Sequence, residues 1–225
     1  MMRWELINKL ISKHNYRNYL EIGQQKGQTF REINIEKKEG VDPNPKMTLN
    51  VECKNHMTSD QFFEKIKNEL PGISYDIVFI DGLHIMEQVL KDIDNSTRFL
   101  NKEGTIVVHD CNPENEYQQL TAKDSTKRKD RKLARGDNTN GTWTGDVWKA
   151  FLTLRMRRPD LKMLTVDTDC GCGIIQFGHQ ELFKSNVEDV FTWEFFNKNR
   201  EKILNLISVE EFKELLSKDL LWMFW

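Results

Sequence analysis

The stretch Tyr75-Asp-Ile-Val-Phe-Ile-Asp-Gly82, together with Gly104-Thr-Ile-Val-Val-His-Asp110, decides the fold. Both runs are apolar at almost every position, which is the pattern of parallel strands covered by helices on both faces. Between them, Met86 to Leu100 has the length and the apolar spacing of an amphipathic helix. The three segments together predict a strand–helix–strand unit with parallel strands.

The chain before this unit continues the alternation of strands and helices. Strands are predicted at Tyr19 to Gly23, from Lys37 up to Pro43 and at Thr48 to Val51, with helices at Thr29 to Ile33 and from Ser59 onward. Such an alternation is typical of a doubly wound α/β sheet. The sequence therefore predicts a Rossmann-like α/β fold with a mainly parallel sheet and helices on both faces.

The chain after this unit contains a polar segment, a hairpin and a charged tail. Residues 114–145 are polar and include a basic cluster at 123–132, and they fit either a mobile lid or insert, or a plain solvated loop. Leu161 to Val166 and Gly173 to Gly178 predict a hairpin that adds antiparallel strands at the edge of the sheet. Residues 180–225 predict a helical tail, and we expect one domain over residues 1–225.

The composition is that of a polar-surfaced globular protein. The chain has 225 residues, a net charge of −2 and a hydrophobic fraction of 38%. No window approaches the ~20 consecutive apolar residues of a membrane helix, so we expect no membrane insertion. The four cysteines lack zinc-finger spacing and are expected as reduced thiols in the cytoplasm. Collagen, coiled-coil, disulfide-scaffold and transmembrane classes are excluded.

Acidic and imidazole side chains follow the predicted strands where each one ends. They occur at Glu21 to Gly27, at Asp42, at Asp81 to His84 and at His109-Asp110. In an open α/β sheet, ligands bind outside the carboxyl ends of the strands. We therefore expect these groups to share one edge of one sheet and to form the functional site.

The spacing Glu21-x-Gly23-x-x-x-Gly27 fits a loop that holds a nucleoside. Gly23 lets the chain turn sharply off the strand, and Gly27 lets a ligand approach the backbone closely. Asp42 lies 19 residues after Gly23 (42 − 23), at the end of the next strand. An acidic side chain there accepts hydrogen bonds from ribose hydroxyls.

Together these motifs resemble the class I S-adenosylmethionine (SAM)-dependent methyltransferases, in particular the sugar and natural-product O-methyltransferases. The resemblance covers most of the chain, from about Tyr19 to Gly178, and says more about the cofactor than about the acceptor. The segments that carry it begin at Tyr19, Gly40, Thr58, Tyr75, Gly104, Trp143 and Asp167.

The resemblance implies a seven-stranded sheet and a set of cofactor contacts. Glu21, Gly23 and Gly27 would line the methionine and ribose end, and Asp42 would bind the ribose diol. The loop with Thr58 and Ser59 would lie by the adenine. The remaining implied cofactor contacts are Gln24, which replaces a small residue common in the family, and Asp81.

The acceptor half is predicted from chemistry and from the same resemblance. A hydroxyl is a poor nucleophile until its proton is being removed, so a base or a metal is expected. The resemblance implies Asp81 and Asp110 as ligands of Mg²⁺, Mn²⁺ or Ca²⁺, His84 as the leading base, and His109 as a second base or further ligand. The predicted function is O-methylation of a sugar, a glycan or a small natural product, with catalytic residues His84, His109 and Asp81.

Plainer interpretations of these residues stay open. Asp81-Gly82 also fits a turn that ends a strand, and His84 and His109 also fit packed or capping histidines. Trp143 fits either a core position or the wall of an acceptor pocket. A homo-oligomer is equally open, because terminal pairing is known only by analogy with the fold.

Other functions remain as alternatives. A nicotinamide-dependent oxidoreductase is disfavoured, because Gln25 and Gln28 occupy positions where a dinucleotide loop carries glycine. A non-catalytic or nucleic-acid-directed protein of the same fold is a further alternative. The basic cluster at 123–132 and the apolar tail Trp222 to Trp225 allow the non-catalytic protein. For the nucleic-acid-directed protein the basic cluster is the only support, and the overall charge gives no reason to expect a nucleic-acid partner.

Overall fold

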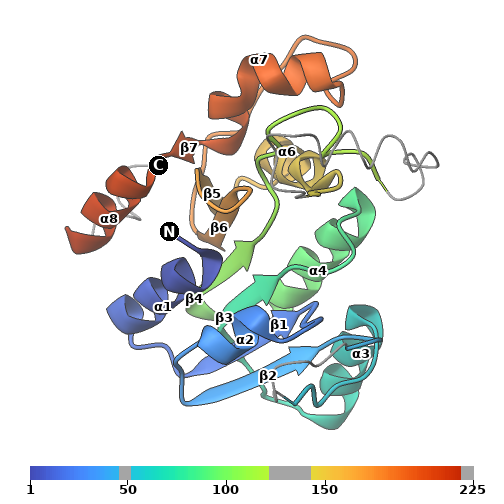
Figure 1. Ribbon diagram of the computed structural model, residues 1–225, viewed down its shortest axis with the longest axis vertical. Helices are drawn as coiled ribbons and strands as arrows, with labels where there is room; N and C mark the ends of the chain where they lie inside the picture. The colour runs from blue at the N-terminus through green and yellow to red at the C-terminus, as the bar shows by residue number, and fades with distance from the viewer. Residues whose placement is uncertain (46–51, 122–142, 219–225) are drawn as a thin grey trace. The chain divides into compact units, whose positions relative to one another are not determined.

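The computed structural model describes residues 1–45, 52–121 and 143–218 (Figure 1). The chain divides into two compact units. The first unit comprises Met1–Leu83 and Gln88–Val108, and the second comprises His84–Glu87 and His109–Trp225. The predicted strand at 48–51 lies outside the described residues, and so does most of the predicted insert at 114–145.

The first unit is built on parallel strands in the order β2-β1-β3-β4. These are β1 (Asn18–Ile22), β2 (Lys37–Val41), β3 (Tyr75–Ile80) and β4 (Leu100–Val108). The register pairs Ile22 with both Val41 and Ile80, so the carboxyl ends of β1, β2 and β3 lie level. Residues that follow these strands therefore share one edge.

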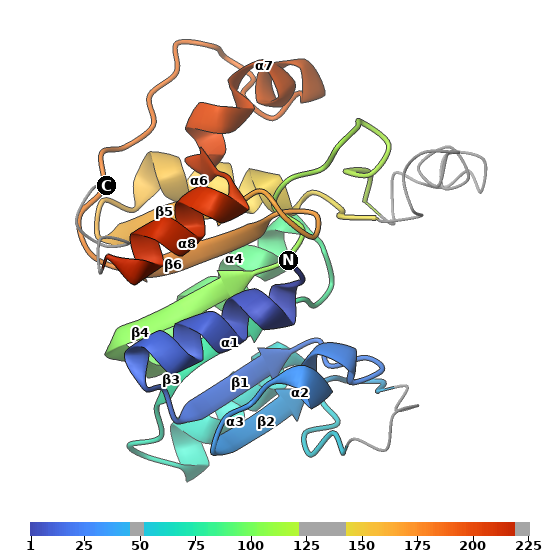
Figure 2. The ribbon, with the colours of Figure 1, turned by 60° about the vertical axis from the view of Figure 1, so that its left-hand side comes forward.

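Helices cover both faces of this sheet. Figure 2 shows α1 on one face and α3 and most of α4 on the other. The helices are α1 (Arg3–His14), α2 (Gln28–Glu32), α3 (Ser59–Glu69) and α4 (Met86–Phe99). The core between the layers includes Leu20, Phe79 and Ile93, none of which has exposed surface. Burial of such side chains stabilises each by about 1.5–3 kcal/mol.

The predicted strand–helix–strand unit is confirmed, with one difference in its bounds. Strand β3 and helix α4 lie where the apolar pattern put them, but β4 begins at Leu100 rather than Gly104. The register between β3 and β4 shifts between Tyr75 and Ile77. The first residues of β4 are half-exposed or exposed, so the apolar pattern did not mark them as strand.

The second unit contains the predicted hairpin. Strands β5 (Leu161–Val166) and β6 (Cys172–Phe177) pair antiparallel, and β7 (Leu206–Ile207) pairs parallel with β5. The helices of this unit are α6 (Val147–Arg157), α7 (Trp193–Leu204) and α8 (Val209–Ser217).

The strand order of the described residues confirms the predicted fold class. It runs β2-β1-β3-β4-β6-β5-β7, a seven-stranded, mainly parallel sheet with antiparallel pairing near one edge. The outermost strand, β7, has two residues and was not predicted. Among the helices that the structure describes, none is both long enough and apolar enough to cross a bilayer.

Candidate active site

The loop after β1 turns on two glycines with left-handed backbones. Gly23 has φ +90° and Gly27 has φ +74°, a region that side chains other than glycine rarely adopt. A Cβ on Gly23 would lie 2.1 Å from the carbonyl oxygen of Asp81, so the loop packs directly against the chain that leaves β3. The amide of Gly23 donates to the carbonyl of Val41 at 2.8 Å. Glycine at position 23 therefore lets the ends of β1, β2 and β3 meet.

Asp42 joins the end of β2 to this loop. Its Oδ2 accepts from the amide of Gln25 at 2.8 Å, and its Oδ1 accepts from the amide of Asn44 at 2.8 Å. A carboxylate has about four acceptor positions, so two backbone donors leave capacity for others. Asp42 is half-exposed, and these two bonds fix its carboxylate at the end of β2.

Gln24 carries a buried amide whose oxygen has no donor. Its Nε2 donates to the carbonyl of Glu52 at 3.2 Å, while Oε1 is buried and accepts no hydrogen bond within the described residues. The side chain lies over Gly40, where a Cβ would collide with it. A buried acceptor without a donor costs about 1–3 kcal/mol, so a polar ligand that donates here would relieve that cost.

Glu21 is a nearly fully buried carboxyl group beneath the same edge. It accepts a hydrogen bond from the hydroxyl of Tyr19. Burial is the main cause that raises its pKa, the charge of Asp81 adds to it, and the Tyr19 hydrogen bond and the charge of Arg3 oppose it, for a net pKa of about 8. The Nε of Arg3 lies 3.9 Å from Oδ2 of Asp81. The edge thus offers two acidic groups and one guanidinium.

The predicted adenine loop is tied into helix α3. The hydroxyl of Thr58 accepts from the amide of Gln61 in a capping box at the start of the helix. The hydroxyl of Ser59 accepts from Nε2 of Gln88, which also donates to the buried Asp92. Burial raises the pKa of Asp92 to about 6. The side chains of Thr58 and Ser59 therefore also fix the loop.

The residues of the first unit suit SAM. A left-handed glycine loop admits close approach, Asp42 can accept from a diol, and the carboxylate of Asp81 favours a cationic ligand. The orphan oxygen of Gln24 adds an acceptor. This set of hydrogen-bond acceptors fits a nucleoside that carries a positively charged amino-acid chain.

In the second unit, one carboxylate lies between two imidazoles. Oδ2 of Asp110 is 3.0 Å from Nδ1 of His84, and Oδ1 of Asp110 is 3.2 Å from Nδ1 of His109. On its other side, Nε2 of His109 lies 3.7 Å from Oδ1 of Asp169. Asp110 and His109 are buried, and His84 is partly exposed. This row of groups can hold and transfer a proton.

Strained backbone places these side chains. His84 has φ +56° and Asp110 has φ +64°, although neither is glycine. Asp169, Cys170 and Gly171 are also left-handed in succession, and the carbonyls of Cys170 and Gly171 accept from the chain just after Asp110. Such conformations cost about 1–3 kcal/mol each and occur preferentially at functional sites.

The segment before α6 holds His84 from the other side. The ring of Trp143 stacks on His84, with centroids 5.1 Å apart and planes 17° apart. Nε1 of Trp143 donates to the carbonyl of Leu120 at 2.5 Å. The amide of Asp146 donates to the carbonyl of His84 at 3.3 Å, and Oδ1 of Asp146 accepts from the amide of Met86 at 2.7 Å.

Roles for Asp146 and Asp169 were not predicted from the sequence. Both lie in segments that carry the family resemblance, Trp143 to Lys149 and Asp167 to Gly173. Their position in these segments is the sequence feature from which a role could have been predicted. The predicted metal ligands divide between the units, with Asp81 in the first and His109 and Asp110 in the second. The metal set stays a prediction.

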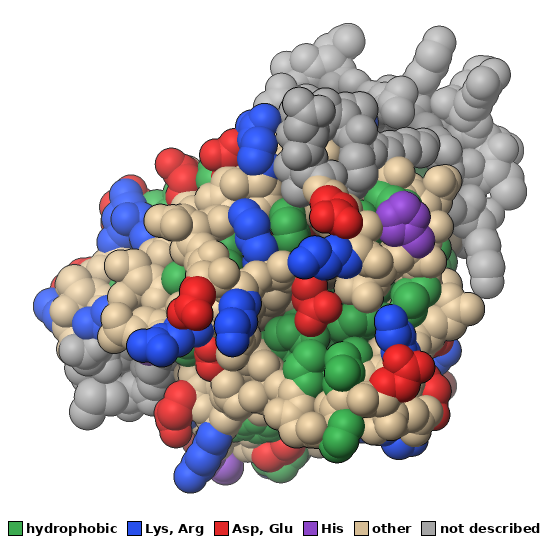
Figure 3. Space-filling model, turned by 90° about the horizontal axis from the view of Figure 1, so that it is seen from below, with side chains coloured by type: hydrophobic (Ala, Val, Ile, Leu, Met, Phe, Trp, Pro, Cys, Tyr) green, Lys and Arg blue, Asp and Glu red, His purple; other side chains and the backbone are tan. Residues whose placement is uncertain are grey.

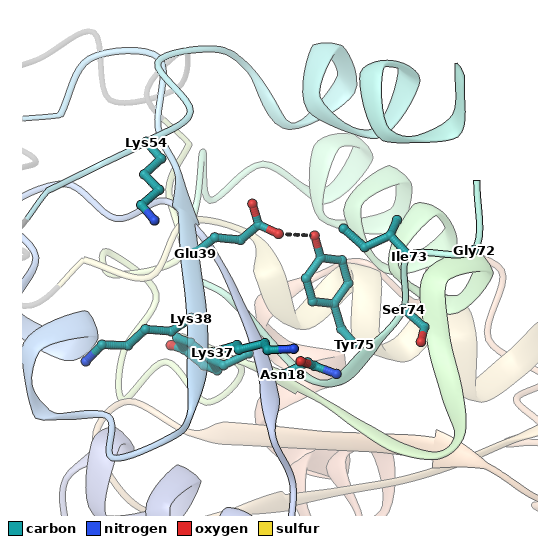
Figure 4. Close-up of a pocket in the computed structure, with 10 residues that line it drawn as sticks. Asn18, Lys37, Lys38, Glu39, Lys54, Gly72, Ile73, Ser74 and Tyr75 are labelled. Atoms are coloured by element: carbon teal, nitrogen blue, oxygen red, sulfur yellow. Dashed lines mark hydrogen bonds between the residues drawn. The ribbon is translucent and has the colours of Figure 1, made fainter. Parts of the chain in front are cut away.

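A pocket of about 470 Å³ lies elsewhere in the first unit. Its lining includes Asn18, Lys37 and Tyr75, the first residues of β1, β2 and β3 (Figure 4). The hydroxyl of Tyr75 donates to Glu39 inside it. This pocket opens at the amino ends of the strands, whereas ligands of such sheets bind at the carboxyl ends. It is therefore not the candidate active site.

Comparison with known proteins finds a methyltransferase match over part of the chain. Residues 20–111 match a family described as a methyltransferase domain. No curated protein sequence matches the chain.

Three similar solved structures share the fold at low sequence identity. A SAH-bound methyltransferase of Podospora anserina has a TM-score of 0.55 at 12% identity and covers 78% of each chain. An O-methyltransferase of Streptomyces achromogenes involved in tomaymycin synthesis, in complex with SAM, has a TM-score of 0.54 at 13% identity. The match covers 78% of this chain and 79% of that chain. An O-methyltransferase of Bacillus cereus in complex with SAH has a TM-score of 0.50 at 16% identity. The match covers 77% of this chain and 78% of that chain.

Proposed function

We propose that the chain is a class I SAM-dependent methyltransferase that methylates a hydroxyl oxygen of a sugar, a glycan or a small natural product. The observation that carries the proposal is the pair formed by His84 and Asp110, with Nδ1 and Oδ2 3.0 Å apart. An imidazole held by a carboxylate is suited to take the proton from an alcohol. The O-methyltransferases of Streptomyces achromogenes and Bacillus cereus, which share the fold, support oxygen as the methylated atom.

The proposed chemistry divides between cofactor and protein. SAM supplies, when bound, an electrophilic methyl group on a sulfonium. Glu21, Gly23, Gln24, Gly27, Asp42 and the loop with Thr58 and Ser59 are the proposed cofactor contacts. Asp81 follows β3 directly and is proposed to serve the same ligand. These groups are proposed to hold the nucleoside.

His84 is the proposed general base. Its Nδ1 faces the buried Asp110, which stabilises the imidazolium that forms when Nε2 takes the proton. His109 lies on the other carboxylate oxygen and fixes the position of Asp110, with Asp169 behind it. Trp143 covers one face of the imidazole and keeps water from that side.

We also propose that a divalent cation assists the reaction. Asp81, Asp110 and His109 are the proposed ligands, and an oxygen-rich set suits Mg²⁺, Mn²⁺ or Ca²⁺. A cation would lower the pKa of a bound hydroxyl and so share the work of a base. Activity measured with added Mg²⁺ and with EDTA tests this part separately.

The location and the partners complete the proposal. The four cysteines, Cys53, Cys111, Cys170 and Cys172, are thiols rather than disulfides, which supports the proposal of a reducing compartment such as the cytoplasm. The acceptor is proposed to be a small molecule or a glycan rather than a nucleic acid. Figure 3 shows one face on which acidic and basic side chains are interspersed, unlike the single-sign surface that phosphate backbones require.

The test is a screen of hydroxyl acceptors followed by a variant of the base. Formation of S-adenosylhomocysteine (SAH) identifies an acceptor, beginning with sugars and glycans. The variant His84→Gln should lower kcat by about 10²–10⁴-fold and leave the Kd for SAM unchanged. His179→Gln, at an exposed position of the same unit, is the matched control. Wild-type kcat in His84→Gln would contradict the assignment of His84 as base.

A further inference from the structure

The pocket at the amino ends of β1, β2 and β3 has the size of a ligand site. Its volume of about 470 Å³ lies within the range of roughly 300–1,000 Å³ that is typical of small-molecule pockets. All the residues that line it belong to the first unit. None of the proposed cofactor contacts is among them. The pocket is therefore a second cavity, separate from the candidate active site.

Hydrogen bonds hold one wall of this pocket in place. The hydroxyl of Tyr75, a residue only 3% exposed, donates to Oε1 of Glu39 (Figure 4). The Nδ2 of the buried Asn55 donates to Oε2 of Glu39 at 3.3 Å. Both oxygens of the one carboxylate among the lining residues are thus bound by neutral donors of the wall. The wall is formed without a ligand.

Three lysines bring positive charge to the lining, and two of them are available to a ligand. The Nζ of Lys38 donates to the carbonyls of Phe30 and Ile33 at 2.7 and 2.8 Å, so this ammonium is already engaged. Lys37 and Lys54 are exposed, and neither ammonium has an ion pair or a hydrogen bond among the residues that the structure describes. Figure 4 shows them on opposite sides of the hydrogen bond that crosses the pocket.

Two neutral donors lie beside these ammonium groups. The side chains of Asn18 and Ser74 line the pocket, are half-exposed and form no hydrogen bond within the described part of the chain. The backbone amide of Asn18 donates to Oδ2 of Asp76 at 2.9 Å, which fixes the position of Asn18. The pocket thus offers two ammonium groups, an amide and a hydroxyl, against one carboxylate that is already bound. Such a set favours an anion, because hydrogen bonds from an ammonium to a phosphate or a carboxylate are charge-assisted.

We propose that this pocket binds a small molecule that carries a phosphate or a carboxylate group, with Lys37 and Lys54 as its charged donors. Asn18 and Ser74 supply neutral hydrogen bonds to the same molecule. Strand β1 separates this pocket from the glycine loop by about 13–16 Å, at ~3.3 Å per residue. The anion and SAM therefore do not compete for the same space.

The test is calorimetric titration of the protein with pyrophosphate and with citrate at one fixed, low ionic strength. The wild type should bind at least one of them in a saturable event. Lys37→Gln and Lys54→Gln should each weaken that binding at least about fivefold, as loss of a charged hydrogen-bond donor implies. Lys65→Gln removes an exposed lysine of α3 outside the pocket, so it is the matched control and should change the affinity less than about twofold.

The two probes separate the two kinds of anion. Binding of pyrophosphate alone would identify a phosphate ligand, and binding of citrate alone would identify a carboxylate ligand. Excess SAH should leave the binding of either probe unchanged. Three results would overturn the inference: no binding of either probe to the wild type, an equal loss in Lys65→Gln, or displacement of the probe by SAH. None of these results depends on methyl transfer, so the proposed function is tested separately.

Discussion

Glu21→Gln should remove a large part of the pH dependence of stability. Burial raises the pKa of Glu21 from an ordinary 4.5 to about 8. The folded protein therefore holds a proton that the unfolded chain releases between these values, so stability falls as the pH rises through this window. At about 1.36 kcal/mol per pKa unit, the unfolding free energy should fall by about 4 kcal/mol between pH 5 and pH 9.

The assay is urea unfolding of the wild type and of Glu21→Gln across that pH range without ligand. Glutamine keeps the size of the side chain and can still accept the hydrogen bond from Tyr19. Every other titrating group is shared, so the difference between the two curves isolates Glu21. Curves that stay parallel from pH 5 to pH 9 would refute the burial argument, because a loss of about 4 kcal/mol is a large share of typical stability.

Three further predictions concern the glycine turn and the base. Gly23→Ala and Gly72→Ala both place a side chain at φ near +90°, but a Cβ at Gly23 meets Asp81 at 2.1 Å while Gly72 has open space. Thermal unfolding should show a cost of about 1–2 kcal/mol at Gly72 and about 1–3 kcal/mol more at Gly23, and equal costs would contradict the packing. Asp110→Asn should lower kcat at least about a hundredfold with SAM affinity kept, and a loss confined to affinity would speak against its role beside the base. Trp143→Ala should lower kcat up to about tenfold, the value of one aromatic stack, and unchanged turnover would remove it from the site.

Much of the fold follows from apolar patterning alone. The runs that become β3 and β4 are apolar on both faces, and only strands buried between helix layers need that pattern. The sequence also predicted the hairpin of β5 and β6, because two mostly apolar runs lie on either side of a glycine-containing turn. Strand β7 did not, because Leu206 and Ile207 are too few residues to show a period.

The residue types of the candidate site could be predicted from the sequence, but the contacts between its side chains could not. Strand ends bring Glu21, Asp42 and Asp81 to one edge, and that follows from the parallel register. The approach of Asp169 to His109 depends on consecutive left-handed residues at one turn, a backbone choice that residue type does not dictate. The bond from the Gln25 amide to Asp42 likewise depends on how the loop after β1 bends.

Calorimetric titration of the wild-type protein with SAM and SAH, each with Mg²⁺ and with EDTA, tests the central claim most directly. One saturable binding event is expected for each ligand, in the micromolar range, because Asp42 can accept from the ribose hydroxyls and Asp81 can pair with the ammonium of the amino-acid chain. A folded protein that binds neither ligand under either condition would contradict it.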